Sequence, residues 1–445
     1  MRRLIAAGIV IILGLTVSAS PGPAVTFTES TLENGLRLIV AEDHAAPVFS
    51  IAVVYDVGSR NEREGRTGFA HLFEHMMFRG SANVGVGEHF YTVFSNGGTM
   101  NGTTDKERTL YFETMPANQL DAAMFLEGDR MRSLEITKAS LDNQRNAVQE
   151  ERRLRVDNQP YGTTGEVLDT LAIDNAAYRH SVIGSMEDLT AASVEDVAAF
   201  FKTYYAPNNA VVAVAGDVTT ARVRELAMKY FGSIPAQPAP PAVDLTQSAQ
   251  TAERRATVDD ALARVPRVTI SYRVPPTASP DDDALAVLQL VVGSGRSSRL
   301  NETLVRQRQL ATSITASAGR SRGPRLLQIT AMPFPGKSLA ELEAAIGEEI
   351  DRVKSGPIAD WEMEKARNTA RRQFVVGLQS SLNRAVGLAE SALFYGSPGA
   401  INEREQRVSK VTAADIQRVA KQYLTSENRS VVTTRVKAPA GRGGL

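Results

Sequence analysis

The sequence predicts an α+β protein with two similar domains, each with helices packed on a mainly antiparallel sheet. With 445 residues, of which 43% are hydrophobic and 22% charged, the chain is long enough to bury more than one core. A proline-rich stretch, residues 235–241, interrupts the chain near its middle. A helix-then-strand pattern recurs on the two sides of this stretch, which indicates that the second domain repeats the first.

The repeat is clearest at residues 190–198 and 412–420, which both begin with Thr-Ala-Ala and lie 222 positions apart. Each copy continues with apolar residues at helical spacing, then an aromatic residue, and then a Val-Val pair, at 211–212 and at 431–432. A helix docked on a strand in both halves favours two related domains over a chance likeness of helix-then-strand segments.

Hydrophobic periodicity predicts the other elements in chain order. The first are a strand, turn and strand at 27–41, a strand at 49–55, a helix from Thr67 to Gly80, helices at 118–134, 140–156 and 194–204, a strand at 210–214, and a helix at 283–292. We therefore expect five parts: a signal peptide at 1–24, an N-terminal domain at 25–234, a linker at 235–250, a C-terminal domain at 251–437, and a flexible tail at 438–445.

The N-terminus has the layout of a secretory signal peptide. Two arginines precede an almost continuous apolar run, residues 4–17, and small residues and prolines follow up to Ala24. The run is short for a membrane span, which needs about 20 residues. We expect cleavage after Ala24 and a periplasmic or secreted protein; a retained N-terminal anchor is the alternative.

Composition restricts the partners but not the compartment. Fifty basic and fifty acidic side chains cancel, so no charge excess indicates nucleic acid as a partner. The chain has no cysteine, which is compatible with any redox compartment.

The predicted helix from Thr67 to Gly80 carries a candidate metal site. His71, Glu74 and His75 fall on one face of it, because residues three and four apart are neighbours on a helix. Two imidazoles one turn apart can bind one Zn²⁺, and a carboxylate on the same face can take a proton from a water that the metal acidifies. The alternative is that two core histidines lie one turn apart by chance. The chain has only five histidines, so two of them in this arrangement favour a metal site.

A catalytic zinc usually takes three protein ligands, so a third must come from elsewhere. The predicted helix 140–156 offers Glu150 and Glu151, and periodicity alone does not choose between them. The remaining histidines are also possible, although nothing in their surroundings favours them: His44, His89 and His180.

The order His-x-x-Glu-His and its surroundings resemble the pitrilysin/insulinase family of zinc metallopeptidases, the inverzincins. The branch that the chain resembles is that of mitochondrial processing peptidase and its bacterial relatives. Four stretches carry the likeness, and with the later repeat it extends over nearly the whole mature chain: 57–62, 68–80, 98–104 and 143–151.

The resemblance implies a role for three further residues of the first domain. The family's third ligand lies about 76 residues after the second histidine, which is Glu151 and not Glu150. Where the family has a supporting glutamate two turns earlier, this chain has Gln144, which can hydrogen-bond but adds no charge behind the metal. Asn101 stands in the family's edge strand, which pairs with the substrate backbone, although a turn of small polar residues is the alternative.

The second domain resembles a family domain that has lost its metal site. Its Gly/Ser-rich turn, residues 293–300, is not a phosphate loop, because no Lys-Ser/Thr follows in register. Many relatives then have an arginine and a tyrosine that reach the substrate. Here Arg306 matches the arginine, but Thr312 lies nearest to the tyrosine's position, so we expect a weak clamp or a tyrosine from another subunit.

The function implied is a zinc endopeptidase with one Zn²⁺ per chain, held by His71, His75 and Glu151, that cleaves peptides or unfolded segments. Glu74 would activate the water and protonate the leaving amine. The resemblance also implies that two chains enclose a chamber, as a homodimer or as a heterodimer with a paralogue. The alternatives are a non-catalytic scaffold subunit and a hydrolase of another amide or ester.

Overall fold

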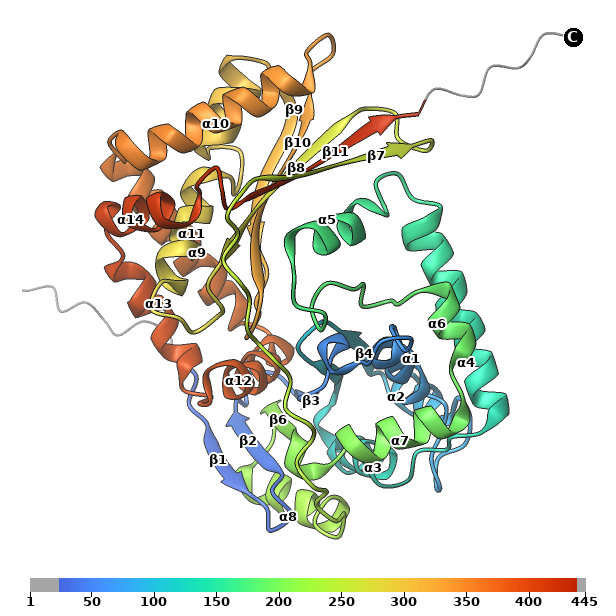
Figure 1. The fold of residues 1–445 in the computed structure, drawn as a ribbon. Coiled ribbons are helices and arrows are strands. Elements are labelled where there is room, and N and C mark those ends of the chain that lie inside the picture. The colour runs from blue at the N-terminus through green and yellow to red at the C-terminus, as the bar shows by residue number, and fades with distance from the viewer. Residues whose placement is uncertain (1–23, 438–445) are drawn as a thin grey trace, which may run out of the picture.

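A computed structural model describes residues 24–437, which form two mixed sheets with helices packed on both (Figure 1). We call residues 24–234 the first half and residues 251–437 the second half. The predicted signal peptide, apart from Ala24, and the predicted tail lie outside the described residues. Between residues 24 and 437, no helix is long and apolar enough to cross a membrane.

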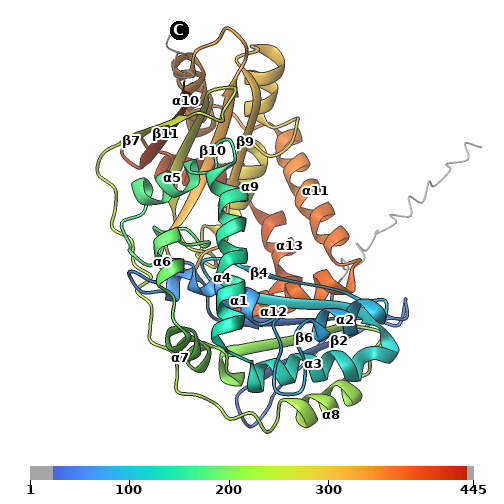
Figure 2. The same ribbon diagram turned by 90° about the vertical axis from the view of Figure 1, so that its right-hand side faces the viewer.

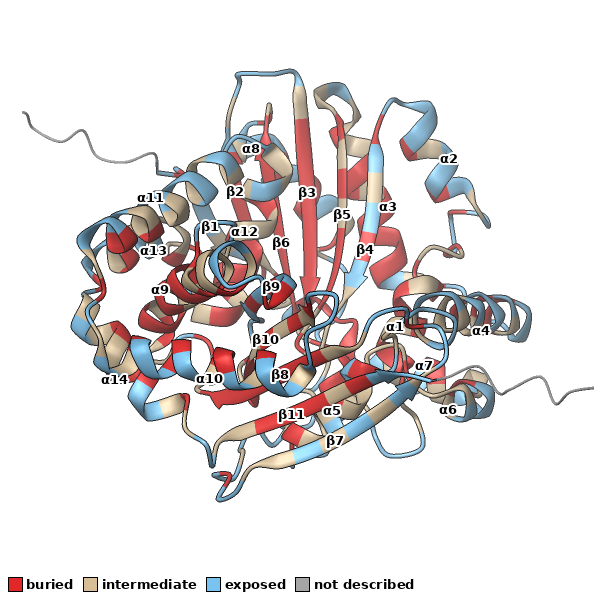
Figure 3. Cartoon of the chain, turned by 90° about the horizontal axis from the view of Figure 1, so that it is seen from above, coloured by how far each residue is buried: buried red, intermediate tan, exposed pale blue. Residues whose placement is uncertain are grey.

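The first sheet has the strand order β1-β2-β6-β3-β5-β4, in which β2 and β6 are parallel and the other neighbours antiparallel. Its strands are β1 (Thr28–Thr31), β2 (Arg37–Glu42), β3 (Val48–Tyr55), β4 (Thr99–Thr104), β5 (Thr109–Pro116) and β6 (Ala210–Gly216). The central strands β3 and β6 are buried almost throughout (Figure 3), because helices cover both faces of the sheet. Strand β4 forms one edge.

The second sheet repeats this topology in the order β7-β11-β8-β10-β9, again with one parallel pair, β7 and β11. Its strands are β7 (Arg254–Asp260), β8 (Arg267–Val274), β9 (Ala311–Ala318), β10 (Arg325–Pro333) and β11 (Arg429–Val436). Each strand matches one of the first sheet in order and direction. The predicted α+β class with two similar sheets is therefore confirmed.

Helices fill the connections in both halves. Those of the first half are α1 (Phe69–Met76), α2 (Glu88–Ser95), α3 (Leu120–Ser133), α4 (Lys138–Arg152), α5 (Thr164–Ala172), α6 (Met186–Ala191), α7 (Val194–Tyr204) and α8 (Thr220–Tyr230). Those of the second half are α9 (Asp282–Val292), α10 (Leu339–Ser355), α11 (Asp360–Gly377), α12 (Ser381–Tyr395), α13 (Ala400–Lys410) and α14 (Ala413–Tyr423). Irregular helical turns occur at Ser59–Asn61, Ala117–Gln119, Arg153–Asp157, Pro207–Asn209 and Asn301–Gln307.

The two halves exchange a helix each. Helix α12 of the second half packs on β3 and β6 of the first sheet (Figure 1). Leu388 and its neighbours on this helix join an apolar core there. Helix α5 of the first half packs on β11 and β7 of the second sheet (Figure 2). Leu168 of this helix is buried there. Each half thus buries one sheet face under a helix from the other, so each of these two apolar cores is built from both halves.

The structural repeat has a different register from the one that the sequence predicts. Helix α7 is capped by the Ser193 hydroxyl and α14 by that of Thr412, which are 219 residues apart rather than 222. The side chains of Asn209 and Asn428, also 219 apart, each donate to the carbonyl of a tyrosine at the preceding helix end. The two registers differ by three residues, which is nearly one helical turn. The apolar residues of the two helices therefore match almost as well in the 222-residue alignment as in the 219-residue one.

Candidate metal centre

Helix α1 is held at its N-terminus by a buried carboxylate. The Glu62 oxygens accept from the backbone N–H groups of Gly68 and Ala70, at 2.8 and 2.7 Å. A negative group suits a helix N-terminus, where N–H groups lack helical partners. Thr67, where the sequence predicts that this helix begins, does not cap it, because the Thr67 hydroxyl donates to Asp188. Glu62 therefore fixes the start of the helix that carries the two histidines.

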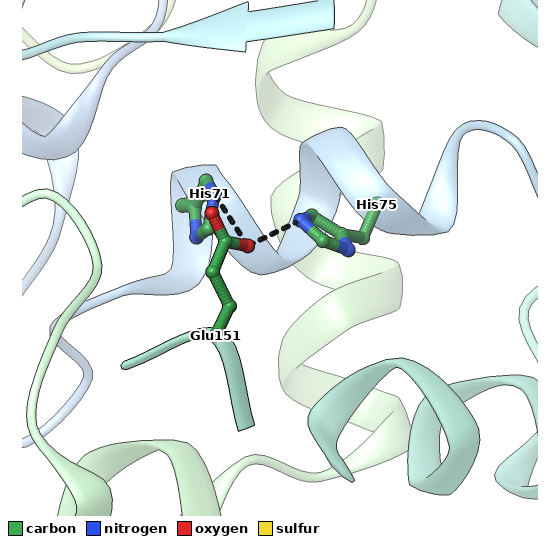
Figure 4. Close-up of side chains that lie close together, drawn as sticks. All are labelled: His71, His75 and Glu151. Atoms are coloured by element: carbon green, nitrogen blue, oxygen red, sulfur yellow. Dashed lines mark ion pairs between the residues drawn. The ribbon is translucent and has the colours of Figure 1, made fainter. Parts of the chain in front are cut away.

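The structure brings His71, His75 and Glu151 together (Figure 4). Glu151 Oε2, on α4, lies 3.3 Å from His75 Nε2 and 3.7 Å from His71 Nε2. Ligands about 2.0–2.1 Å from a tetrahedral zinc stand about 3.3 Å from one another. The two distances to Glu151 are near this value, and all three donor atoms lie within 4.8 Å of one another, because α1 packs against α4.

The electrostatics of this cluster also suit a metal. Burial, helped by the neighbouring His75, lowers the pKa of His71 to about 4, so its imidazole is neutral at pH 7. The hydrogen bond with His75 lowers the pKa of Glu151, with His71 and Arg155 adding to it, so this carboxylate is ionised. Among the described residues, the buried Nδ1 of His71 has no hydrogen-bond partner. Two imidazoles and one carboxylate form a fitting zinc donor set.

Glu74 lies beside this set without belonging to it. Its side chain is only 8% exposed and packs against Gly102 of β4, and its Oε2 accepts from the Thr104 hydroxyl at 2.6 Å. Burial raises the pKa of Glu74, and the Thr104 hydrogen bond opposes that rise. A buried carboxylate with raised proton affinity, next to a metal site, has the properties of a general base.

The other candidate ligands lie elsewhere. Glu150 is 64% exposed and pairs with Arg153. His44 pairs with Asp217 on the surface, His89 is buried against Glu113, and His180 lies near Glu62. Of the two adjacent acids on α4, the structure turns Glu151 toward the histidines and Glu150 toward solvent.

Gln144 and Asn101 have local partners. Gln144 is buried on α4, the helix that also carries Glu151. Its side-chain amide donates to the side-chain oxygen of Asn143 at 2.7 Å. Asn101 is exposed on β4, and its side-chain oxygen accepts from the N–H of Gly102 at 2.9 Å. Within residues 24–437, β4 pairs only with β5, so its outer edge is open to another strand.

Arg306 is not part of the metal cluster. It lies in the helical turn Asn301–Gln307 of the second half, is 64% exposed, and pairs with Glu302 at 3.1 Å. It lines an open groove of about 560 Å³ together with Thr312 and residues of β9.

The sequence did not single out Thr104 or Glu62, although both contact the site helix. A signal for Thr104 existed: in a strand, alternate residues share a face, so Gly102 and Thr104 point to the same side. Nothing local in the sequence indicated that this side faces α1. Glu62 precedes the helix by too many residues for a standard capping pattern.

Comparison with known proteins gives a consistent result. The family described as Insulinase (Peptidase family M16) matches residues 37–184, and Peptidase M16 inactive domain matches residues 191–370. The first match contains the metal cluster and the second contains α9.

Individual relatives match over nearly the full length. The chain is 29% identical over 436 residues to zinc protease PqqE of Helicobacter pylori, covering 97% of this chain and 98% of that one. It is 24% identical to a probable mitochondrial-processing peptidase subunit beta of Arabidopsis thaliana, covering 90% and 77%. The crystal structure of a protease from Helicobacter pylori superposes with a TM-score of 0.88 at 28% identity, covering 92% and 100%.

Proposed function

Because the chain belongs to the insulinase family of peptidases, family M16, we propose that it is a zinc-dependent endopeptidase that hydrolyses peptides or unfolded polypeptide segments. One observation carries the proposal: His71, His75 and Glu151 offer three donor atoms within 4.8 Å of one another, and the buried Glu74 lies beside them. The relative named zinc protease PqqE, similar over nearly the whole chain, supports it.

In this proposal His71 Nε2, His75 Nε2 and a Glu151 oxygen hold one Zn²⁺ per chain. The ion would supply a positive charge that polarises the scissile carbonyl and acidifies water. Glu74 takes the proton of the attacking water and delivers it to the leaving amine. The hydroxyl of Thr104 holds the Glu74 carboxylate in place for both transfers.

Substrate binding is proposed for the open edge of β4, where an extended peptide would add as a further strand beside Asn101. From the second half, Arg306 would bind a substrate carbonyl or carboxylate through its guanidinium. Gln144, two turns before Glu151 on the same helix, would support the metal site by hydrogen bonding without adding charge behind the metal.

We further propose that two chains, identical or paralogous, assemble around the substrate. The relative named as a subunit beta of a processing peptidase supports an assembly. The N-terminal pattern of residues 1–24 supports export to the periplasm or beyond, with a mature chain that begins near Val25. Size-exclusion chromatography with light scattering tests whether two chains assemble. N-terminal sequencing of the native protein tests whether the mature chain begins near Val25.

The test of the function uses the purified chain, its zinc content, and an unfolded protein and a folded protein as substrates. We expect one zinc per chain, cleavage of the unfolded substrate alone, loss of cleavage after chelation, and recovery on adding Zn²⁺. A chain that binds zinc but cleaves no peptide would contradict the proposal. It would then favour a scaffold subunit, or a hydrolase of another amide or ester if such a substrate is turned over.

A further inference from the structure

The hairpin turn between β4 and β5, residues 105–108, is held by charged contacts on every side. Asp105 closes the turn, since its side chain accepts from the backbone N–H groups of Glu107 and Arg108. Lys106 reaches Asp169 of α5 at 2.6 Å. The other two side chains, Glu107 and Arg108, extend to the second half of the chain.

Glu107 is buried and is surrounded by donors. The loop between β9 and β10 supplies three of them: the Ser321 hydroxyl at 2.9 Å, and the Arg322 backbone N–H and Nε at 2.9 and 3.1 Å. From the first half, the Tyr178 hydroxyl donates at 2.8 Å. The guanidinium of Arg60 also forms an ion pair with Glu107, with Nη1 at 3.3 Å from Oε2.

Arg322 joins the two halves through more than Glu107. Its guanidinium also pairs with Asp56, which directly follows β3. Burial alone would raise the pKa of Glu107, but Arg60, Tyr178 and Arg322 outweigh it and hold that pKa below its ordinary value. Two carboxylates and two guanidiniums therefore balance in this buried cluster, and each depends on the others.

Arg108 provides a second anchor. Its Nε and Nη2 donate to one oxygen of Glu390, on the exchanged helix α12, at 3.1 Å each. Its Nη1 donates to the backbone carbonyl of Thr103, in β4, at 2.9 Å. Arg320, from the β9–β10 loop, pairs with the same Glu390. One buried acid of α12 thus holds both the hairpin and the loop.

These anchors lie next to the proposed general base. Thr104, the last residue of β4, directly precedes the turn and donates to Glu74, and Gly102 packs against the Glu74 side chain. A shift of the turn would move the Thr104 hydroxyl and the open edge of β4 together. A displacement of about 1 Å can change rates 100-fold when it disturbs reacting groups.

We propose that the second half, although its α9 carries no metal cluster, positions the catalytic groups of the first half through these two anchors. Arg322 and Glu390 are then positioning residues: they hold the hairpin, the hairpin holds Thr104 and the β4 edge, and Thr104 holds Glu74. The inference rests on the proposed peptidase function. It assigns to the second half a task at the reaction centre that does not require contact with substrate.

The test compares Arg322→Gln and Arg322→Lys with wild type on an unfolded peptide substrate. We expect Arg322→Gln to keep its zinc, to lose about tenfold or more in kcat, and to raise KM, because both Glu74 and the edge strand are displaced. Arg322→Lys keeps a charge opposite Glu107 and Asp56 and should recover part of the loss. The matched control is Arg435→Gln, which removes an exposed pair with Asp259 on the second sheet and should leave both constants unchanged.

A double-mutant cycle separates positioning from simple structural support. In a Thr104→Val background, Arg322→Gln should lower kcat by less than about twofold, because its route to Glu74 is already cut. If the loss of kcat in the double variant equals the product of the losses in the two single variants, the two sites act independently and the proposal is overturned. If Arg322→Gln does not fold, the double variant Glu107→Gln/Arg322→Gln, which removes both charges, and Glu390→Gln at the second anchor take its place in the same cycle.

The outcomes distinguish this inference from the function on which it rests. Zinc-loaded wild type that cleaves no peptide overturns the function, and the positioning role with it. Active wild type together with an Arg322→Gln variant of normal kcat and KM overturns the positioning role alone.

Discussion

The two halves place a helix at the same point of the same topology, yet the helices differ in their chemistry. Helix α1 follows β3 and carries His71, Glu74 and His75, with the buried Nδ1 of His71 left without a partner among the described residues. Helix α9 follows β8 and is almost entirely apolar. Its acids are paired within the second half, Asp282 with Arg325 at 2.7 Å and Asp283 with Arg407 at 2.8 Å.

The difference shows what distinguishes a candidate site from a structural element. In α9 the buried charges are neutralised by protein partners, so the helix needs nothing more. In α1 the two histidines instead meet Glu151 of α4, and the three donor groups converge on one point where a single metal ion could bind all of them. We infer that the first half carries the chemistry and the second half supports it.

The largest effect is expected from Glu74→Gln. Glutamine keeps the size of the side chain and can hydrogen-bond, but it cannot accept a proton from water. General acid–base catalysis typically contributes about 10²–10⁴ in rate, and we expect a loss at or beyond the upper end. Zinc content should not change, because in the proposed site three other side chains hold the metal.

The measurement is peptide turnover beside zinc stoichiometry for wild type and Glu74→Gln. The control is Asp283→Asn on α9, a carboxylate at the matching helix of the second half, which should affect turnover little. Near-normal turnover in Glu74→Gln would mean that another group is the base, and lost zinc would mean that Glu74 is a ligand.

The exchanged helices predict that the halves unfold together. Leu388→Ala on α12 and Leu168→Ala on α5 each remove a buried side chain from a core shared by the two halves, which should cost about 2–5 kcal/mol. Chemical denaturation followed by two probes, one in each half, should show one transition that both variants move. Two separate transitions, each sensitive to one variant, would show that the halves are independent.

Thr104→Val should change the pH dependence of activity. The Thr104 hydroxyl donates to the Glu74 carboxylate and so favours its ionised form, which lowers its pKa. Without that hydroxyl the pKa of Glu74 rises, and the acid limb of kcat/KM moves to higher pH. A hydrogen bond to a charged group is worth about 1.5–3 kcal/mol, so its loss should be large enough for the pH profile to resolve.

Thr104→Ser is the control for this pH profile, because it keeps the hydroxyl and should leave the acid limb in place. An unchanged acid limb in Thr104→Val would separate Glu74 from the group that titrates.

The smallest effects are expected at the repeated helix caps. Ser193→Ala at α7 and Thr412→Ala at α14 each remove a hydroxyl that accepts from a backbone N–H of the first helical turn. Each should lower the free energy of unfolding by about 1 kcal/mol, with turnover unaffected. Thr190→Ala, at the position that the sequence alignment matched with Thr412, should cost less, since Thr190 lies within α6 and caps no helix. Equal losses at Ser193 and Thr190 would argue against the 219-residue register.

The sequence predicted most of the centre because its histidines are close in the chain. The spacing of His71 and His75 on one helix is a local property, and it survives folding unchanged. Glu151 could be chosen over Glu150 only through the family resemblance, since the rotation of α4 depends on its packing against α1. Thr104 reaches Glu74 across 30 residues of chain, and no local pattern indicates such a contact.

The fold was predictable in its class and its repetition, and less so in how its parts combine. An amphipathic pattern predicts that a helix buries one face, but it does not say against which sheet. The exchange of α5 and α12 therefore had no sequence signal. The same holds for Glu107 and Arg322, which are 215 residues apart and look like ordinary surface charges until the halves are packed together.

The central claim is that the first half holds one zinc through His71, His75 and Glu151. Its most direct test is the zinc content of Glu151→Gln beside that of Glu150→Gln, two adjacent and chemically identical changes on α4. We predict one zinc per chain in wild type and in Glu150→Gln, and none in Glu151→Gln. Zinc retained in Glu151→Gln and lost in Glu150→Gln would contradict the account.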